Sequence, residues 1–210
     1  MSENNFLKRY TQLFSAIEFL ETGELQLHSP EKWEDTNDSH ALQTFASKAG
    51  ASRIYVLCLT GASETFHHWK VFCPESRGGG GGVCIEFDKE QLIKAAEHAS
   101  LTHNEVDYLR IEDLADGSVQ KKEAPFLKRL PYGDEKEYRL FRTSSSLSKD
   151  KTLSFEVPRE AIQRITLSPW MSSETAQKCR QYIKQIDGCK NIAIVHSTLM
   201  DNKDWKEAIA

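Results

Sequence analysis

The sequence predicts an α+β fold, with a mixed, largely antiparallel central sheet and helices packed on it. Short β-rich runs recur along the chain, and helical patterns lie between them. One continuous apolar run, residues 54–60, is typical of a central strand that is buried on both faces. The helical and strand patterns do not alternate regularly, which favours an α+β fold over a doubly wound parallel sheet.

The first quarter of the chain is predicted to contain two helices, one strand and one loop. Residues 10–22 carry apolar side chains at helical spacing, and Gly23 suits the position just past a helix end. Residues 24–28 alternate between polar and apolar, as a short strand does. The turn-forming residues of 29–38 predict a loop, and 39–48 can form a short helix.

Two N-cap residues mark helices in the middle of the chain. Ser63 and Asp88 can each accept a hydrogen bond from the first turn of a following helix. Gln91 stands three residues after Asp88, which is the spacing of a capping box. The helices predicted here are residues 64–72 and 89–98, and the strands are residues 54–60, 83–87 and 105–109.

The last part of the chain mixes helices and strands. Residues 119–130 have a helical pattern, although Pro125 opposes a helix there. Residues 136–142 mix charged and apolar side chains, which predicts a strand with one polar face. The remaining elements are a flexible connection at 144–150, strands at 152–157, 162–167 and 191–195, and a helix at 172–185. We predict one domain, residues 1–210, with a C-terminal helix–strand extension from about residue 170.

Composition narrows the compartment and the partners. The chain has 27 Lys and Arg against 31 Asp and Glu, a formal net charge of −4. A mildly acidic chain has no global field for nucleic acid or an anionic membrane, so both partners are disfavoured. No apolar run approaches the ~20 residues that span a bilayer, and no signal pattern begins the chain. The five cysteines form no C-x-x-C pair. We expect a cytoplasmic protein without a metal site; the sequence names no cofactor.

Five consecutive glycines, residues 78–82, follow a predicted helix and precede a predicted strand. Phosphate-binding loops place their glycines after a strand and before a helix, so this run is not a P-loop. A cradle of backbone N–H groups beside Arg77 stays open as an interpretation. The other interpretation is a flexible turn, because glycine resists ordering.

The strand at 136–142 carries the sharpest functional pattern. Residues two apart on a strand share a face, which would align Glu135, Glu137 and Arg139. One glutamate can act as a general base, with its pKa raised by the second carboxylate. Arg139 can bind a phosphate or a carboxylate through two N–H groups. The competing interpretation is a solvated face of an edge strand, with cross-strand ion pairs.

Weaker candidates lie elsewhere. His67 and His68 are adjacent and do not form the i, i+4 pair of a metal site. His68, next to Trp69, can lie at a pocket rim, but we expect it at the surface. Asp35 and Asp38 can either bind a cation or cap helices and close turns. A local basic patch is offered by Lys121, Lys122, Lys128 and Arg129.

The order of several short motifs is the last observation. They are Tyr10, GELQLHSP at 23–30, WED at 33–35, VLCLT at 56–60, Trp69, GVCIEF at 82–87, VDY at 106–108, Lys128 and EKEYR at 135–139. Over roughly residues 10–170, this order resembles the bacterial "domain of unknown function 2971" family, whose activity is unassigned. The chain departs from the family pattern in the loop at 33–35, after Trp69, and in the length of its glycine run. The resemblance implies one constellation of Trp69, Glu135, Glu137 and Arg139.

The leading hypothesis is a small cytosolic enzyme that acts on a nucleotide-like, phosphate-bearing substrate. Glu135 and Glu137 would be catalytic; the predicted substrate-binding residues are Trp69, Arg77, Lys128 and Arg139. ADP-ribosyl transfer from NAD is one concrete version, by analogy with sites that place a Glu-x-Glu beside the scissile bond.

Two hypotheses from other classes stay open. One is a non-catalytic ligand- or partner-binding module in a defence or toxin-related system. The other is a metal-dependent nuclease that would cluster Asp35, Asp38 and the glutamate pair. A buried Glu137 beside Arg139 would favour chemistry, whereas a solvated Glu137 on a flat face would favour binding.

Overall fold

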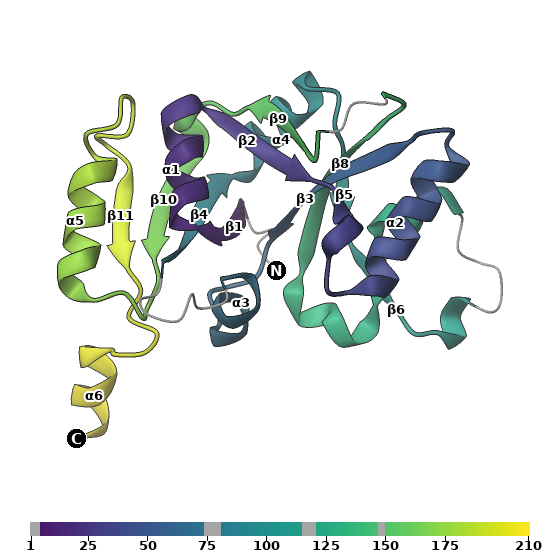
Figure 1. Cartoon of the computed structure of the whole chain (residues 1–210). Helices are drawn as coiled ribbons and strands as arrows, with labels where there is room; N and C mark the ends of the chain where they lie inside the picture. Colours follow the sequence, from purple (N-terminus) through teal and green to yellow (C-terminus); the bar gives the residue numbers. More distant parts are fainter. Residues whose placement is uncertain (1–4, 74–80, 115–120, 147–149) are drawn as a thin grey trace. The chain divides into compact units, whose positions relative to one another are not determined.

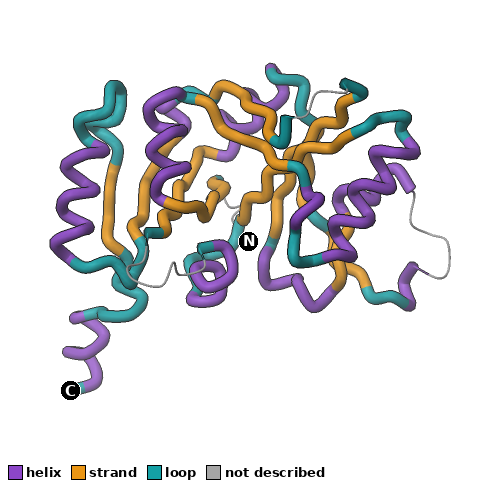
Figure 2. The backbone as a smooth tube through the Cα atoms, viewed as in Figure 1, coloured by secondary structure: helices purple, strands orange, loops and turns teal. Residues whose placement is uncertain are grey.

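The computed structural model describes residues 5–73, 81–114, 121–146 and 150–210, and the fold is α+β as predicted (Figures 1 and 2). Backbone contacts divide the chain into two compact units. The first unit comprises Met1–Glu24, Ser63–Leu92 and Val157–Ala210, and the second comprises Leu25–Ala62 and Ile93–Glu156. Each unit is therefore assembled from stretches that are far apart in the sequence.

The first unit contains a mixed sheet built around one central strand. Its strands are β1 (Phe6–Gln12), β4 (Gly82–Asp88), β10 (Ile162–Leu167) and β11 (Ala193–His196). β4 pairs antiparallel with both β1 and β10, and β11 pairs parallel with β10. The predicted C-terminal extension thus contributes a strand to this sheet.

Helices of the first unit pack on these strands. α1 (Leu13–Thr22) and α3 (Phe66–Phe72) contact β1, and α5 (Ser173–Ile183) contacts β11 (Figure 1). The predicted helix 10–22 begins too early, because β1 runs to Gln12 and pairs with β4 along its whole length. Tertiary pairing therefore overrides the local pattern there. The 3₁₀ helix η5 (Arg159–Ala161) precedes β10.

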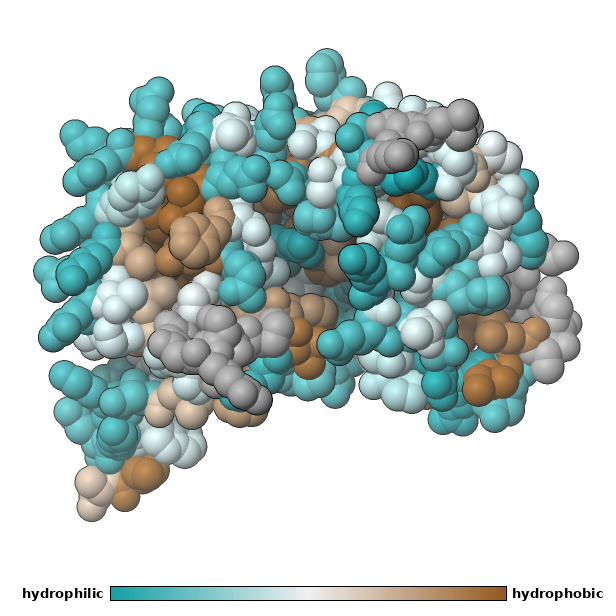
Figure 3. Space-filling model, viewed as in Figure 1, coloured by the Kyte–Doolittle hydropathy of each residue, from teal (hydrophilic) through white to brown (hydrophobic). Residues whose placement is uncertain are grey.

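The C-terminal helix α6 (Lys203–Ile209) was not predicted from the sequence. Its Trp205 and Ile209 are exposed, and brown atoms mark this segment at the lower left of Figure 3. Among the residues that the structure describes, no helix has both the length and the apolar character needed to cross a bilayer.

The second unit is built around a central antiparallel pair. Its strands are β2 (Glu24–His28), β3 (Arg53–Thr60), β5 (Thr102–Glu105), β8 (Glu137–Ser144) and β9 (Thr152–Glu156), with a separate parallel pair of β6 (Asp107–Leu109) and β7 (Leu127–Arg129). β8 lies between β3 and β5 and pairs antiparallel with both. β2 joins β3 on its other side.

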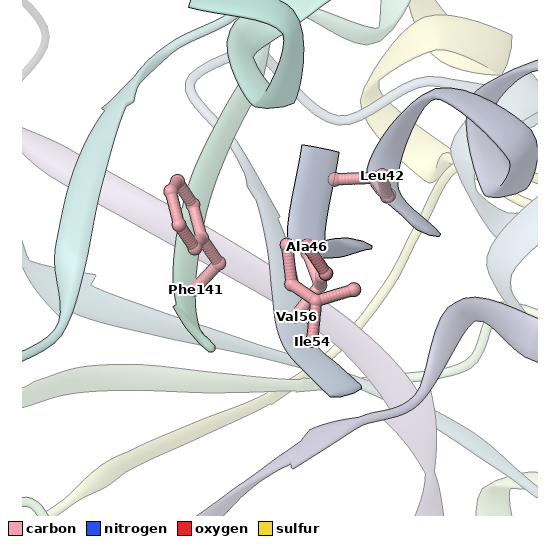
Figure 4. Close-up of a cluster of buried hydrophobic side chains, with 5 residues drawn as sticks. All are labelled: Leu42, Ala46, Ile54, Val56 and Phe141. Atoms are coloured by element: carbon pink, nitrogen blue, oxygen red, sulfur yellow. The ribbon is translucent and has the colours of Figure 1, made fainter. Parts of the chain in front are cut away.

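Helix α2 (Thr36–Lys48) packs on β3 and closes a hydrophobic core. The core residues are Leu42, Ala46, Ile54, Val56 and Phe141, drawn in Figure 4. They come from α2, β3 and β8, so the core holds helix and sheet together. The helix α4 (Lys89–His98) follows Asp88, whose carboxylate accepts a hydrogen bond from the N–H of Gln91 at 2.9 Å, as predicted for an N-cap.

The predicted helix at 119–130 is wrong. The described residues there form the 3₁₀ helix η3 (Lys121–Phe126), then β7, then the 3₁₀ helix η4 (Leu130–Glu135). Pro125 and Pro131 lack the N–H that a continuous α-helix needs, which explains the short 3₁₀ segments. Two further 3₁₀ helices, η1 (Pro30–Lys32) and η2 (Glu112–Leu114), complete the elements of this unit.

Candidate functional site

The polar residues of β8 lie inside the second unit. Arg139 is completely buried and Glu137 is 5% exposed. Glu137 faces Thr60 and Arg139 faces Cys58 in the register with β3, and β5 covers the other edge of the strand. The interpretation of this segment as a solvated edge strand is therefore wrong.

Arg139 is held by a complete set of acceptors. Its Nε donates to Glu137 Oε1 at 2.7 Å, and its Nη2 donates to Glu137 Oε2 at 2.9 Å and Asp38 Oδ2 at 2.8 Å. Its Nη1 donates to Asp38 Oδ1 at 3.0 Å and to the Pro125 carbonyl at 2.8 Å. These bonds account for the five N–H groups of a guanidinium. Arg139 therefore joins α2, η3 and β8 through all of its N–H groups, and its predicted role in binding a phosphate stays a prediction.

Lys128 on β7 brings the second cation to the same carboxylates. Its Nζ lies 2.6 Å from Glu135 Oε2, 3.2 Å from Glu137 Oε2 and 3.9 Å from Asp38 Oδ2. Only 10% of its side chain is exposed. The ring of Tyr132 lies 4.8 Å from the ammonium group. Lys128 therefore bridges all three carboxyl groups of the cluster, and its predicted role as a substrate-binding cation stays a prediction.

Glu135 reaches the cluster from a different element than predicted. It is the last residue of η4, and the next residue, Lys136, has a left-handed backbone with φ of 42°. Glu135 therefore does not share a strand face with Glu137. The two side chains meet through Lys128 instead. We define the buried charge network as Asp38, Lys128, Glu135, Glu137 and Arg139.

The buried charge network contains three carboxyl groups and two cations. Burial by itself raises the pKa of Glu137, but the Arg139 guanidinium and Lys128 outweigh it and lower the pKa to about 2. Burial raises the pKa of Glu135 despite the hydrogen bond from Lys128. Burial also raises the pKa of Asp38, against the effect of Arg139. Glu137 is thus firmly ionised, while its two neighbours bind protons more readily than usual.

The buried charge network does not include Trp69, a predicted partner of the glutamate pair. Trp69 belongs to the first unit, where it is completely buried and its indole Nε1 donates to Glu64 Oε1 at 2.7 Å. The predicted shared site of Trp69 and the glutamates stays a prediction. Arg77 and three of the five glycines fall outside the described residues; of the run, only Gly81 and Gly82 are described.

His68 is buried, which corrects the predicted surface position. It is 1% exposed, and its ring stacks on Tyr10 with 5.5 Å between centroids. Its backbone N–H donates to the Thr65 hydroxyl, the N-cap of α3. Thr65, not Ser63, therefore begins this helix.

Asp35 and Asp38 have separate roles. Asp35 caps α2, because its carboxylate accepts hydrogen bonds from the N–H groups of Asn37 and Asp38. Asp38 belongs to the buried charge network, a role that sequence reasoning missed. Oxygens of Asp38, Glu135 and Glu137 face protein cations. Within the described ranges, no cluster of His, Cys, Asp or Glu side chains is arranged to hold a metal ion.

Comparisons with known proteins give matches among solved structures. No family model matches the chain, and no curated protein matches it. The chain is similar to Thermus sp. 2.9 DarT in complex with NAD+, at 12% identity over 97% of this chain and 98% of that chain, with a TM-score of 0.48. For the complex of the same protein with carba-NAD+, the identity is 13%, the match covers 98% of this chain and 99% of that chain, and the TM-score is 0.49. For the complex of the same protein with ADP-ribosylated ssDNA, the identity is 12%, the match covers 97% of this chain and 96% of that chain, and the TM-score is 0.47.

Proposed function

We propose that this chain is an ADP-ribosyltransferase-like enzyme, with a nucleotide-like, phosphate-bearing donor such as NAD+ as its substrate. One observation carries the proposal. The carboxylates of Glu135 and Glu137 both contact the ammonium group of Lys128, yet the pKa of Glu135 is raised and the pKa of Glu137 is lowered. Environments that separate the pKa values of neighbouring carboxyl groups create an acid/base assignment. Glu135 is the proton-exchanging carboxyl group and Glu137 the permanently charged one.

The roles follow from the contacts. Glu137 holds Arg139 and Lys128, so we assign it as a positioning residue, and Glu135 as the catalytic one. A base works best when its pKa lies near the operating pH, and burial moves Glu135 in that direction.

In the proposed reaction, the bond between ribose C1′ and the nicotinamide nitrogen breaks, and its electron pair leaves with nicotinamide. An acceptor oxygen or nitrogen forms the new bond to C1′, and its proton passes to Glu135. The net negative charge of the buried charge network favours the positive charge that develops on the ribose.

Nicotinamide release from NAD+ tests the proposal. NAD+ is the donor that ADP-ribosyl transfer requires, and acceptors should include single-stranded DNA and protein. We expect Glu135→Gln to lower turnover by about 10²-fold or more, because a general base typically contributes that much. Glu156→Gln, an exposed change on β9, is the matched control and should retain full activity. A wild-type chain that neither binds NAD+ in calorimetry nor releases nicotinamide with any acceptor contradicts the proposal.

A second candidate is a non-catalytic ligand- or partner-binding module. The saturation of Arg139 by protein acceptors favours it, because such a network stabilises the fold without recognising a ligand. NAD+ binding without nicotinamide release, unchanged in Glu135→Gln, would support this candidate over the enzyme.

A further inference from the structure

The first unit contains a polar pocket of its own. It has a volume of about 250 Å³ and is lined by residues of β1, β4 and β10, by Glu64, and by the chain from the end of β11 onward. Pockets for drug-sized ligands typically span about 300–1,000 Å³, so this one suits a smaller molecule. None of the residues of the buried charge network lines it.

One wall of the pocket is cationic. Lys8 Nζ lies 3.6 Å from Glu86 Oε2, and Arg164 Nη2 lies 3.0 Å from the same oxygen. Lys8 and Arg164 therefore bring two cations to one carboxylate oxygen at this wall. The Arg164 side chain is 46% exposed, so a ligand can reach it. A guanidinium beside an ammonium group is a typical arrangement for binding a carboxylate or a phosphate.

An acid and a hydroxyl also line the pocket. Glu64 accepts hydrogen bonds from Trp69 Nε1 and from the Ser197 hydroxyl, and both reach the same oxygen, Oε1. No hydrogen bond from a described residue reaches the other oxygen, Oε2. This carboxylate is fixed in place by two neutral donors, and its second oxygen is available to a donor on a ligand.

The hydroxyl of Tyr10 is a second recognition group. Tyr10 is 5% exposed and lines the pocket, and within the described residues its Oη meets only the Cys84 thiol, a weak hydrogen-bonding group, without regular hydrogen-bond geometry. A buried hydroxyl without a strong partner is costly, and a bound ligand can supply that partner. Burial, together with Cys84 and Glu64, holds the pKa of Tyr10 far above its usual value, so the hydroxyl stays neutral.

We propose that this pocket binds a small zwitterion. Its anionic group, a carboxylate or a phosphate, lies against Lys8 and Arg164, and its ammonium group lies against Glu64 Oε2 and the Tyr10 hydroxyl. The positive wall alone would favour a simple anion, and Glu64 adds selection for a cationic group on the same molecule. Binding here does not require activity at Glu135.

Calorimetry on the full chain tests the proposal. The zwitterionic probes are O-phosphoethanolamine and 4-aminobutanoate, which distinguish a phosphate from a carboxylate. Inorganic phosphate and ethanolamine each carry only half of the recognised charges. We expect one zwitterion to bind at least tenfold more tightly than either half-ligand, because charge-assisted hydrogen bonds act at both ends. The wild-type affinity does not depend on whether NAD+ is turned over, so failure here and failure of the proposed function are separate results.

Matched variants locate the binding. Arg164→Ala and Glu64→Gln should each weaken the zwitterion by about tenfold or more, since each removes a charged partner. Lys178→Ala, an exposed cation of α5, should leave the affinity unchanged. Tyr10→Phe should weaken binding by about threefold or more without lowering the melting temperature, because the Cys84 thiol beside that hydroxyl is only a weak hydrogen-bonding group.

Three results overturn the proposal. The first is a wild-type chain that binds neither zwitterion. The second is binding that survives both Arg164→Ala and Glu64→Gln. The third is inorganic phosphate binding as tightly as O-phosphoethanolamine, which would make the pocket an anion site only. Should Glu64→Gln impair folding, binding that survives both Arg164→Ala and Tyr10→Phe takes the place of the second result and overturns the proposal.

Discussion

Arg139 connects parts of the second unit that are distant in sequence. Its guanidinium contacts Asp38 on α2, the Pro125 carbonyl in η3 and Glu137 on its own strand. Removing one partner of a buried ion network leaves charges unpaired, which typically destabilises a protein by about 3–5 kcal/mol. Arg139 therefore stabilises the packing of these three elements against one another.

Substitution of Arg139 tests that role. We expect Arg139→Met to lower the free energy of unfolding by about 3–5 kcal/mol in urea titrations. The control is Arg142→Met on the same strand, where the guanidinium donates one hydrogen bond to the Ala99 carbonyl and a loss of about 1 kcal/mol is expected. Equal losses of unfolding free energy in the two variants would show that the contacts of Arg139 contribute no more to stability than those of Arg142.

The pKa of Glu137 predicts an acid-sensitive contribution to stability. The ordinary value is 4.5 and the folded value is about 2, so the contribution is complete above pH 4.5 and is lost as the pH falls toward 2. At about 1.4 kcal/mol per pKa unit, it amounts to about 3 kcal/mol. The raised pKa values of Asp38 and Glu135 act in the opposite direction, because their protonation on acidification favours the folded state.

Unfolding in urea at several pH values measures this contribution. The stability gap between the wild type and Glu137→Gln should shrink by about 3 kcal/mol between pH 4.5 and pH 2. The gap between the wild type and Glu156→Gln, an exposed control, should stay constant. If the difference in stability between the wild type and Glu137→Gln does not change between pH 4.5 and pH 2, the pKa of Glu137 is not lowered.

The sequence identified part of this network. Glu137 and Arg139 were grouped by their spacing on a strand, which the structure has as β8. Asp38 was grouped with the glutamates only in the nuclease hypothesis, and its contact with Arg139 was missed because the two residues stand 101 positions apart and no local pattern links them. Glu135 was placed on the wrong element, because the left-handed backbone at Lys136 separates it from the strand.

At the scale of elements, the last glycine of the run, Gly82, has no space for a larger side chain. A Cβ atom at Gly82 would lie 2.7 Å from Cys73 Cβ and 2.9 Å from its sulfur, whereas a Cβ at Gly81 would meet nothing within 4 Å. Gly82 is therefore required by the close approach of β4 to Cys73, the residue after α3. Gly81 has no such requirement.

An alanine pair tests this difference. Gly82→Ala should destabilise the chain by about 1–3 kcal/mol, because overpacking forces the neighbours to shift. Gly81→Ala should be nearly neutral, and both are measured by thermal unfolding. A neutral Gly82→Ala would mean that Cys73 can move aside.

The start of α3 offers a second test between neighbouring residues. The Thr65 hydroxyl accepts the His68 N–H at 3.1 Å, whereas Ser63 was the cap predicted from the sequence. Thr65→Ala should cost about 1 kcal/mol in thermal unfolding, and Ser63→Ala should cost much less. The opposite order would restore the predicted cap. Both residues are good caps by type, and only the structure decides between them.

Whole elements were predicted best where one pattern was continuous. Residues 54–60 and 83–87 lie in the buried strands β3 and β4. The helix at 119–130 failed because two prolines break the backbone hydrogen bonds that a helical pattern presumes. Strand β1 was not predicted, because the helical spacing of apolar residues in 10–22 overlaps the end of this strand.

At the scale of the whole molecule, the first unit depends on both ends of the chain. β4 pairs with β1 from the start of the chain and with β10 from its later part. A truncation after residue 156 removes β10, β11 and α5, and should leave this unit unfolded by circular dichroism and amide exchange. A truncation after residue 202 removes only α6, whose residues are exposed, and should preserve the wild-type melting temperature. A folded first unit in the shorter chain would contradict the assignment of the units.

The proposed chemistry depends on the separated pKa values of two glutamates that contact the same lysine. A pH titration of the carboxyl ¹³C signals, with Glu135→Gln and Glu137→Gln to assign them, measures both values directly. We predict that Glu137 titrates near pH 2 and that Glu135 titrates above the ordinary 4.5. Two carboxyl groups that titrate together near 4.5 would contradict the account.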